Sequence, residues 1–251
     1  MKTVFITGAT AGFGEACAIK YAQNGYGLIL NGRRKERLES LKASLEDEYG
    51  VSCLLLPFDV QDRKAVFTAV NSLPDEWKNI DILINNAGLA LGRDSFDKAN
   101  LDDWETMIDT NVKGLLYVSK AVVPVMVQNK RGHVINLGSV AAKDIYDKGN
   151  VYCATKVAVE SLSQAMRIEL LPHNIKITAI HPGAAETEFS LVRFKGDEET
   201  ASKIYEGFEP LSAKDVAEAI FYCTSLPAHV CINELVLTST QQANAIYFHK
   251  T

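Results

Sequence analysis

Long hydrophobic runs are missing from this sequence of 251 residues. No window approaches the roughly 18 consecutive apolar residues of a membrane span, and the apolar start Val4-Phe5-Ile6 is shorter than the core of a signal peptide. Positive charge is also scarce, since 26 lysines and arginines face 31 aspartates and glutamates, giving a net charge of −5. Such a chain has no overall positive field to attract nucleic-acid phosphates. We therefore expect a cytoplasmic protein with neither a membrane nor a nucleic acid as partner.

Cysteine is sparse as well, and the five cysteines form neither a CxxC pair nor a cluster with histidine. They are Cys17, Cys53, Cys153, Cys223 and Cys231. This pattern excludes a disulfide framework and a zinc site, so we expect a reducing compartment and no bound metal. What is present is an ordinary globular composition, with 47% hydrophobic and 23% charged residues. It excludes a disordered or low-complexity chain.

Short runs of β-branched and other apolar residues alternate with amphipathic segments of helix length. The expected strands are Thr3–Thr7, Gly27–Asn31, Ser52–Phe58, Ile82–Asn85, His133–Leu137, Ile175–Ile180 and one around Leu235–Leu237. The expected helices are near Gly14–Asn24, Lys35–Tyr49, Arg63–Leu73, Leu101–Asn129, Val151–Leu171 and Ala213–Thr224. The alternation is typical of βαβ units. We predict an α/β fold, a single-domain doubly wound (Rossmann) fold with a seven-stranded parallel sheet and helices on both faces.

Two segments fall outside this alternation within the predicted single domain, residues 1–251. Residues 182 to about 211 have no clear period. Because loops this long in compact domains are usually lids or binding loops, we predict that this segment is the substrate loop. The other segment is the C-terminal tail, residues 238–251, which we expect to join neighbouring subunits.

Three glycines follow the first predicted strand and open the first predicted helix. Gly8 permits a tight turn, Gly12 lets the backbone approach a pyrophosphate, and Gly14 lets the helix pack against the strand. The start of the helix offers free N–H groups to an anion. This context indicates a dinucleotide site, although a plain strand-to-helix turn would also favour glycine.

The second predicted strand ends at Leu30-Asn31-Gly32-Arg33-Arg34, without the carboxylate that binds the ribose 2′-hydroxyl of NAD. Arg33 and Arg34 stand there instead, and a guanidinium pairs with a 2′-phosphate. The sequence therefore favours NADP over NAD. The alternative is that both arginines belong to the solvated start of the following helix.

Further motifs follow in a fixed order. They are Asp59-Val60, Asn85-Asn86-Ala87-Gly88, Asn111, Ser139, the pair Tyr152 and Lys156, and Pro182-Gly183. With the glycine turn of the form TGxxxGxG, this pattern resembles the short-chain dehydrogenase/reductase family over nearly the whole chain.

The resemblance implies how NADP is bound. Asp59 and Val60 would hold the adenine ring, and Asn86 would contact the adenosine-side ribose. The full set of implied cofactor-binding residues is Gly8, Thr10, Gly12, Phe13, Gly14, Arg33, Arg34, Asp59, Val60, Asn86, Ala87, Gly88, Tyr152, Lys156, Pro182, Gly183 and Thr187. Alternatively, Asp59 caps a turn, and Asn85 and Asn86 are ordinary turn formers.

The implied catalytic residues are Asn111, Ser139, Tyr152 and Lys156. Tyr152 would exchange a proton with the substrate oxygen, and Lys156, four residues further on the same helix face, would lower the pKa of the phenol from about 10. Ser139 would hold the substrate oxygen. By resemblance, Asn111 would loosen its helix and help to carry a water between Lys156 and solvent. Read singly, the four could be a half-buried aromatic, a surface lysine, a cap and an exposed helix residue.

Longer stretches are similar to a narrower group, the NADP-dependent 3-hydroxy acid dehydrogenases, and to the sulfoacetaldehyde reductases. These stretches are NNAGLALG from Asn85, DWETMIDTNVKGL from Asp103, GNVY from Gly149, TEFSLVRF from Thr187 and LPAHVCIN from Leu226. The resemblance implies a small anionic hydroxy acid or its aldehyde, of the serine, allo-threonine or 3-hydroxypropionate type, or alternatively sulfoacetaldehyde. The implied substrate-binding residues are Ser139, Asn150, Tyr152 and Arg193.

The substrate anion needs a cation, and a guanidinium matches a carboxylate or sulfonate in geometry. Arg193 is the first candidate, ahead of Lys143, Lys148 and Arg93; alternatively, Arg193 forms an ion pair with Glu186 or Glu188. Cys153, where similar sequences often carry a smaller residue, is interpreted as packing.

Two alternatives concern the whole molecule. A non-catalytic NADP-sensing module would keep the fold without turnover, although it would be free to lose Tyr152 and Lys156. Relatives are commonly tetramers built through two long helices, which leads us to expect a homotetramer; helices buried within one chain would have the same apolar pattern.

Overall fold

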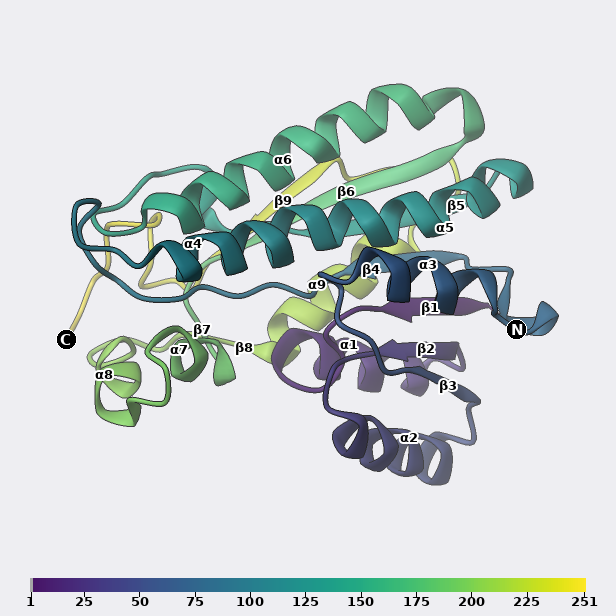
Figure 1. The fold of residues 1–251 in the computed structure, drawn as a ribbon, viewed down its shortest axis with the longest axis horizontal. Helices are drawn as coiled ribbons and strands as arrows, with labels where there is room; N and C mark the ends of the chain where they lie inside the picture. Colours follow the sequence, from purple (N-terminus) through teal and green to yellow (C-terminus); the bar gives the residue numbers. More distant parts are fainter. Residues whose placement is uncertain (1) are drawn as a thin grey trace.

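The computed structural model describes residues 2–251 and contains one seven-stranded parallel sheet (Figure 1). The strand order is β3-β2-β1-β4-β5-β6-β9. The bounds are β1 Thr3–Ile6, β2 Gly27–Asn31, β3 Cys53–Leu56, β4 Ile82–Asn85, β5 Gly132–Leu137, β6 Ile175–Pro182 and β9 Glu234–Leu237. The chain proceeds from β1 toward one edge and returns to β4 to build the other half, so the order reverses between β1 and β4. Ligands bind at such a reversal, outside the carboxyl ends of the strands.

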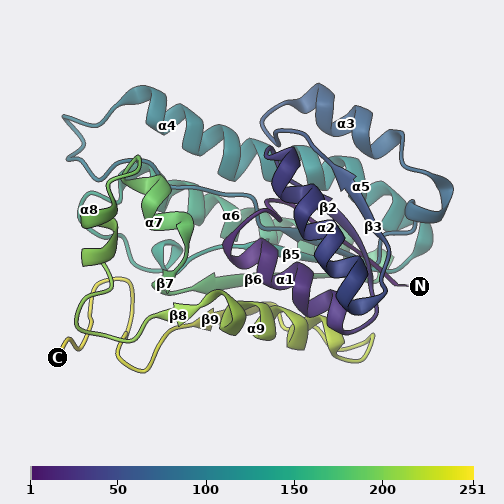
Figure 2. The same ribbon diagram turned by 90° about the horizontal axis from the view of Figure 1, so that it is seen from below.

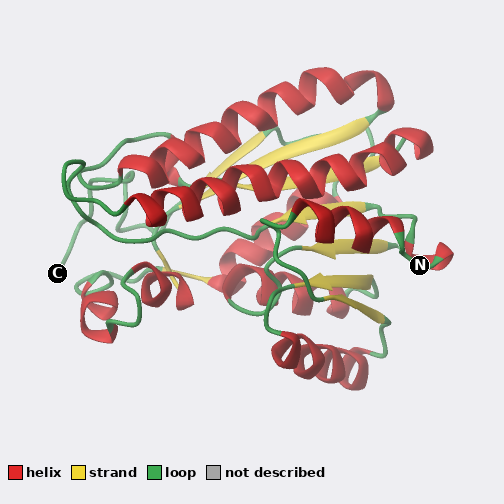
Figure 3. Cartoon of the chain, in the orientation of Figure 1, coloured by secondary structure: helices red, strands yellow, loops and turns green. Residues whose placement is uncertain are grey.

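Helices cover both faces of this sheet (Figure 2, Figure 3). On one face lie α1 (Gly12–Gln23), α2 (Lys35–Tyr49) and α9 (Ala213–Ser225). On the other lie α3 (Arg63–Asn71), α5 (Leu115–Asn129) and α6 (Asn150–Leu170), with α4 (Leu101–Ile108) preceding α5. Short 3-10 turns are η1 Asp75–Trp77, η3 Val140–Ala142 and η4 Leu171–His173. The predicted α/β fold is confirmed.

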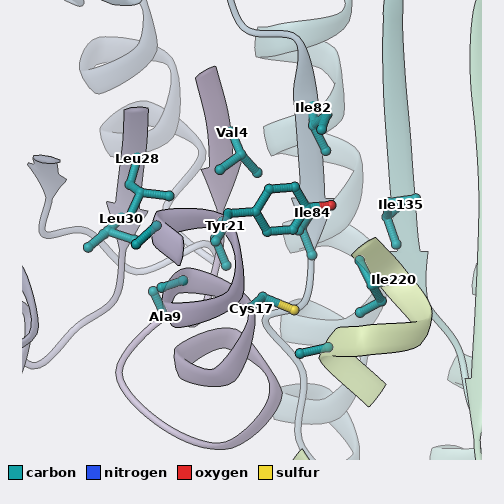
Figure 4. Packing of buried hydrophobic residues seen from close by; sticks show 14 of the residues in the cluster. Val4, Ala9, Cys17, Tyr21, Leu28, Leu30, Ile82, Ile84, Ile135 and Ile220 are labelled. Atoms are coloured by element: carbon teal, nitrogen blue, oxygen red, sulfur yellow. The ribbon is translucent and has the colours of Figure 1, made fainter. Parts of the chain in front are cut away.

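The pleat of the strands separates two clusters of the core, one on each face of the sheet, because successive side chains point to opposite faces. In β1, Val4 and Ile6 face α1 and α9, while Phe5 faces α3 and α5. Figure 4 shows the fully buried Tyr21 of α1 among the strand residues of the first cluster. Its hydroxyl is 2.6 Å from Oγ1 of Thr224, so one side chain both fills the core and links α1 to α9.

The structure corrects two predicted elements. The helix expected over Leu101–Asn129 is α4 and α5 joined by a π-helical segment, η2 (Asp109–Gly114). The expected loop 182–211 contains β7 (Ala185–Glu186), α7 (Glu188–Arg193) and α8 (Glu198–Lys203), and β7 pairs with β8 (Leu211–Ser212). Six-residue helices are too short to show a hydrophobic period, which is why the sequence did not reveal them.

The seven parallel strands end at one edge of the sheet, and α7, α8 and the C-terminal tail lie beyond that edge (Figure 1, Figure 2). The tail bonds to its own chain: the N–H of Thr251 donates to the carbonyl of Gly207 at 2.8 Å, and Phe248 lies 5.0 Å from the ring of Phe208. No helix within residues 2–251 is both long and apolar enough to cross a membrane.

Candidate functional site

The glycine turn between β1 and α1 forms the floor of a cavity of about 310 Å³. Gly8 (φ +66°) and Gly12 (φ +55°) have left-handed backbone conformations, which glycine adopts without strain. A side chain on Gly14 would collide with the carbonyl oxygen of Gly8, so helix and turn pack closely there. Ala11, the N-cap of α1, supplies no side-chain acceptor. The first N–H groups of α1 are thus left without a side-chain cap beside the cavity.

Asn86 follows β4 and holds this turn in place. Its Nδ2 donates to the carbonyls of Thr7 (2.8 Å) and Gly8 (3.1 Å), and its backbone N–H donates to Oγ1 of Thr7 (3.0 Å). Both donor positions of the amide are therefore used within the protein. Asn86 lines the cavity, but its amide supports the glycine turn.

Most of the predicted cofactor-binding residues line this one cavity. They are Gly8, Thr10, Gly12, Phe13, Arg33, Arg34, Asp59, Val60, Asn86, Ala87, Gly88, Tyr152, Lys156 and Thr187. Gly14 lies behind the turn, whereas Pro182 and Gly183 line a second cavity instead. These two residues lie at the carboxyl end of β6 and directly after it, outside the first cavity.

Two arginines and two carboxylates flank the end of β2. Arg34 donates from Nη2 to Oγ1 of Thr10 at 3.0 Å and from Nη1 to Glu188 at 3.1 Å. Arg33 lies 3.5 Å from Asp59, whose other oxygen accepts from the N–H of Gln61. Asp59 therefore caps a turn and pairs with an arginine at the same time.

The second cavity, of about 550 Å³, meets the first along a shared wall. Phe13, Gly138, Tyr152, Thr187 and Phe189 contact both. Ser139 lines only the second cavity, where its Oγ also accepts from the N–H of Ala141 as the N-cap of η3. Tyr152 therefore stands where a group in one cavity can reach a group in the other.

Tyr152 is 8% exposed. Burial raises the pKa of its phenol above the ordinary value, and Tyr146 acts in the same direction; a hydrogen bond with Ser139 and the charge of Arg193 lower it by less. The Nζ of Lys156 lies 5.9 Å from the centre of the ring. The expected net lowering of this pKa by Lys156 is not found, because burial outweighs the nearby charges.

Lys156 and Asn111 are also buried, at 7% and 2% exposed, so neither is a surface residue. Burial lowers the pKa of Lys156 to about 8, and its Nζ donates to the carbonyl of Leu137 at 2.8 Å. Asn111 lies in the π-helical segment, so the local opening of its helix is present. Its amide accepts from and donates to the backbone of Leu89, both at 2.8 Å, and donates to Oγ1 of Thr155 at 3.0 Å.

Arg193 lines the second cavity from the last turn of α7. It donates to the hydroxyl of Tyr146 (3.0 Å) and the carbonyl of Gly92 (3.2 Å), and its Cζ lies 5.6 Å from the centre of the Tyr152 ring. The alternative of an ion pair with Glu186 or Glu188 is wrong: Glu188 pairs with Arg34 and Arg37.

The structure removes three other residues from the predicted substrate site. Asn150 lines neither cavity, because its amide accepts from Nε1 of Trp104 (3.1 Å) and donates to the carbonyl of Asp94 (3.0 Å). Lys143 pairs with Glu160 and Glu234 away from both cavities. Lys148 lines neither cavity, whereas Arg93 lines the second. Cys153 is fully buried, which agrees with its interpretation as packing.

Sequence reasoning missed His181. This fully buried side chain of β6 places Nδ1 3.3 Å from the backbone nitrogen and 3.1 Å from the carbonyl oxygen of Ser139. Its Nε2 has no hydrogen-bond partner and lies 3.7 Å from the carboxylate of Glu234. A side chain on Gly138 would collide with the imidazole, so glycine is required there. Only the position of His181 at the end of a strand, next to Pro182, could have drawn attention to it.

Comparisons with known proteins give one consistent result. The family model described as short chain dehydrogenase matches residues 2–197. The chain is 48% identical over 243 residues to the NADP-dependent 3-hydroxy acid dehydrogenase YdfG of Escherichia coli (strain K12), covering 96% of each. It is 44% identical over 241 residues to sulfoacetaldehyde reductase 2 of Chromohalobacter salexigens, covering 96% and 95%. A solved closed form of serine dehydrogenase complexed with NADP⁺ matches with a TM-score of 0.92 and 47% identity, covering 99% of this chain and 100% of that one.

Proposed function

Because the chain belongs to the short chain dehydrogenase family, we propose that it is an NADP-dependent oxidoreductase of small 3-hydroxy acids and the matching aldehydes. One observation carries the proposal: Tyr152 lines both cavities, together with Lys156 in the first and with Ser139 in the second. A proton donor at this shared wall is what carbonyl reduction by a bound hydride donor requires.

The residues of the first cavity fit NADP. The glycine turn and the uncapped start of α1 suit a pyrophosphate, because their backbone N–H groups can approach an anion closely. The arginines after β2 suit a 2′-phosphate. Buried Val60, at 6% exposed, supplies an apolar wall for an adenine ring. When bound, the cofactor supplies the hydride in reduction or accepts it in oxidation.

Tyr152 transfers the proton. Its raised pKa keeps the phenol protonated at neutral pH, so it can donate a proton to the oxygen of an aldehyde as the carbon is reduced. In the oxidation of the hydroxy acid the proton moves the other way, from the substrate hydroxyl to the phenolate. Ser139 donates a second hydrogen bond to the same oxygen and thereby fixes its position.

Lys156 and Asn111 support this proton transfer. The ammonium of Lys156 is buried near the ring of Tyr152 and favours the phenolate form electrostatically. Its low pKa, about 8, means that this charge is held at neutral pH and lost in alkaline solution. Asn111 fixes the loop at Leu89, which lines the first cavity beside Gly88. It thereby holds the part of the cavity wall at Gly88, which lies next to Lys156.

The position of Arg193 favours an anionic substrate. Its guanidinium lines the second cavity close to Tyr152 and pairs with no carboxylate among residues 2–251. A carboxylate bound there would place the neighbouring carbons of a short acid within reach of the phenol. This geometry supports 3-hydroxypropionate and serine as substrates.

A sulfonate fits the same guanidinium, so sulfoacetaldehyde reduction is the second candidate. The similarity to sulfoacetaldehyde reductase 2 favours it directly. The non-catalytic NADP-sensing module is disfavoured, because Ser139, Tyr152 and Lys156 line two adjoining cavities together, an arrangement that cofactor binding alone does not require.

The test is an assay of the purified protein with NADP⁺ and, separately, L-serine, L-allo-threonine, 3-hydroxypropionate and isethionate, followed by the near-ultraviolet absorbance of NADPH. NAD⁺ serves as the cofactor control. Turnover of the hydroxy acids with NADP⁺ supports the first proposal, and turnover of isethionate alone supports the second. Absence of turnover with all four, with NADPH still bound, supports the sensing module.

We also propose that the protein is a homotetramer and that it is located in the cytoplasm. Apolar side chains are exposed on the helices of one face of the sheet, namely Leu116 at 40% on α5, Val157 at 41% on α6 and Ile108 at 39% on α4. Burial of such side chains between subunits supports a homotetramer. Light scattering that gives a mass of 27.6 kDa would contradict it. A cytoplasmic location agrees with five free cysteines, four of them buried.

A further inference from the structure

Glu188, a carboxylate in the segment 182–211, lines the first cavity. Glu188 opens α7, but its oxygens bond to arginines at the start of α2: to Nη1 of Arg37 at 2.7 Å and to Nη1 of Arg34 at 3.1 Å. The hydrogen bond from Arg37 is the main reason that the pKa of Glu188 lies below its ordinary value. The carboxylate is therefore ionised at neutral pH and shared between two guanidiniums.

Arg34 is also the arginine best placed for a 2′-phosphate. Two of its nitrogens, Nε and Nη2, lie within 3.3 and 3.0 Å of Oγ1 of Thr10, in the wall of the first cavity. Arg33 is held less firmly, with a single contact of 3.5 Å to Asp59. The guanidinium that would meet the phosphate is thus already bonded to a carboxylate.

The same short helix extends to the substrate cavity. Phe189, next to Glu188, lies 5.7 Å from the ring of Tyr152, and Arg193 at the last turn lines the second cavity. Glu188 and Arg193 are the first and last residues of this six-residue helix. This helix thus joins the ion pairs of Glu188 at the first cavity to Arg193 at the second.

We propose that Glu188 is a specificity-determining residue that competes with the 2′-phosphate of the cofactor for Arg34, while Arg37 keeps α7 anchored. The inference rests on the proposed function, since it takes NADP as the cofactor and an anion as the substrate. When the phosphate engages Arg34, Glu188 stays bonded to Arg37, with which it makes the shorter contact. Two arginines thus allow α7 to stay anchored with the phosphate bound.

The proposal predicts opposite effects for two variants that break the same ion pair. Glu188→Gln removes the competing charge, so NADPH binds about two- to fivefold tighter, as expected for a half-exposed pair, while the KM of the hydroxy acid rises by a similar factor. Arg37→Ala leaves the carboxylate to Arg34 alone, so NADPH binds about two- to fivefold more weakly and the KM also rises. The affinity for NADH, which has no 2′-phosphate, stays unchanged in both.

The experiment measures the dissociation constants of NADPH and NADH by cofactor fluorescence, and the KM of the best hydroxy acid. The matched control is Glu186→Gln, an equal charge change on an exposed residue two positions earlier. If Glu188→Gln changes the preference for NADPH over NADH no more than this control does, or lowers it, the competition is refuted. If the unmodified protein itself fails to prefer NADPH, the assignment of the cofactor is refuted instead, so the two failures are distinguishable.

Discussion

At the scale of single residues, burial controls the two groups that the proposed chemistry needs. It raises the pKa of Tyr152 and lowers that of Lys156 to about 8, which in each case favours the uncharged form. Replacing Tyr152 by Phe removes the acidic proton but preserves the ring and its contact with Phe189. We expect Tyr152→Phe to lower kcat by at least about 100-fold and to leave NADPH affinity within about twofold. Steady-state assays and fluorescence titration measure the two effects, and retention of a tenth of the activity would contradict this role for the hydroxyl.

Arg193 is the residue for which an effect on binding and an effect on chemistry can be separated. We expect Arg193→Ala to raise the KM for hydroxy acids about tenfold or more, since hydrogen bonds to charged groups contribute about 1.5–3 kcal/mol. A neutral aldehyde of the same length should be affected far less. Tyr146→Phe is the control, because it removes a partner of Arg193 and keeps the guanidinium. Equal increases for anionic and neutral substrates would exclude an anion-binding role.

His181 does not line the second cavity, but its imidazole contacts the backbone of Ser139, which does. Burial lowers the pKa of His181, so the ring is neutral, and its Nδ1 lies 3.3 Å from the nitrogen and 3.1 Å from the carbonyl oxygen of Ser139. His181→Leu removes this polar contact to the Ser139 backbone, and we expect kcat to fall about tenfold with cofactor affinity unchanged. An asparagine can place an oxygen near the position of Nδ1, so His181→Asn should restore most of kcat. If the two variants behave alike, His181 only fills space.

At the scale of elements, η2 is held by the side chain of Asn111, which satisfies both backbone groups of Leu89. Asn111→Ala leaves those buried groups without partners, and we expect the free energy of unfolding to fall by about 2–3 kcal/mol. Urea denaturation measures this change. Asn129→Ala, at the exposed end of α5, is the control and should cost under about 0.5 kcal/mol. Similar losses in both variants would show that the contacts of Asn111 do not stabilise the segment.

The strands and long helices could be predicted because each is determined by its own residues. Apolar runs such as Leu28–Leu30 fill both faces of a covered sheet, so they are recognisable without knowledge of their neighbours. The pair of β7 with β8 and the bonds of Glu188 to α2 join segments that are far apart in the sequence. No local pattern specifies such contacts.

In the candidate site, too, features set by neighbouring residues could be predicted and contacts between distant segments could not. Tyr152 and Lys156 could be predicted to be neighbours, because four residues on a helix return to the same face. The engagement of Asn150 by Trp104 and Asp94, rather than by a cavity, depends on how loops fold over α6. The sign of the pKa shift of Tyr152 likewise depends on its depth below the surface, which the spacing of residues does not specify.

At the scale of the whole molecule, a histidine in the middle of the sheet should make stability depend on pH. His133 of β5 is 3% exposed, and its Nε2 lies 2.7 Å from Oγ1 of Thr178 on β6. Burial, helped by the charge of Lys176, lowers its pKa to about 3. In the unfolded chain the pKa is about 6.5, so between these values the unfolded state binds one more proton than the folded state.

Stability must therefore fall as the solution is acidified through that window. From pH 7 to pH 5, His133 alone should remove about 2 kcal/mol of the free energy of unfolding. Urea denaturation at several pH values measures the loss in the unmodified chain and in His133→Gln, whose amide can keep a bond to Thr178 but does not titrate. The variant should lose about 2 kcal/mol less over the same range. Because His181 is also buried and shares the direction of the shift, only the difference between the two proteins isolates His133; parallel pH profiles would mean that the imidazole is protonated within the fold.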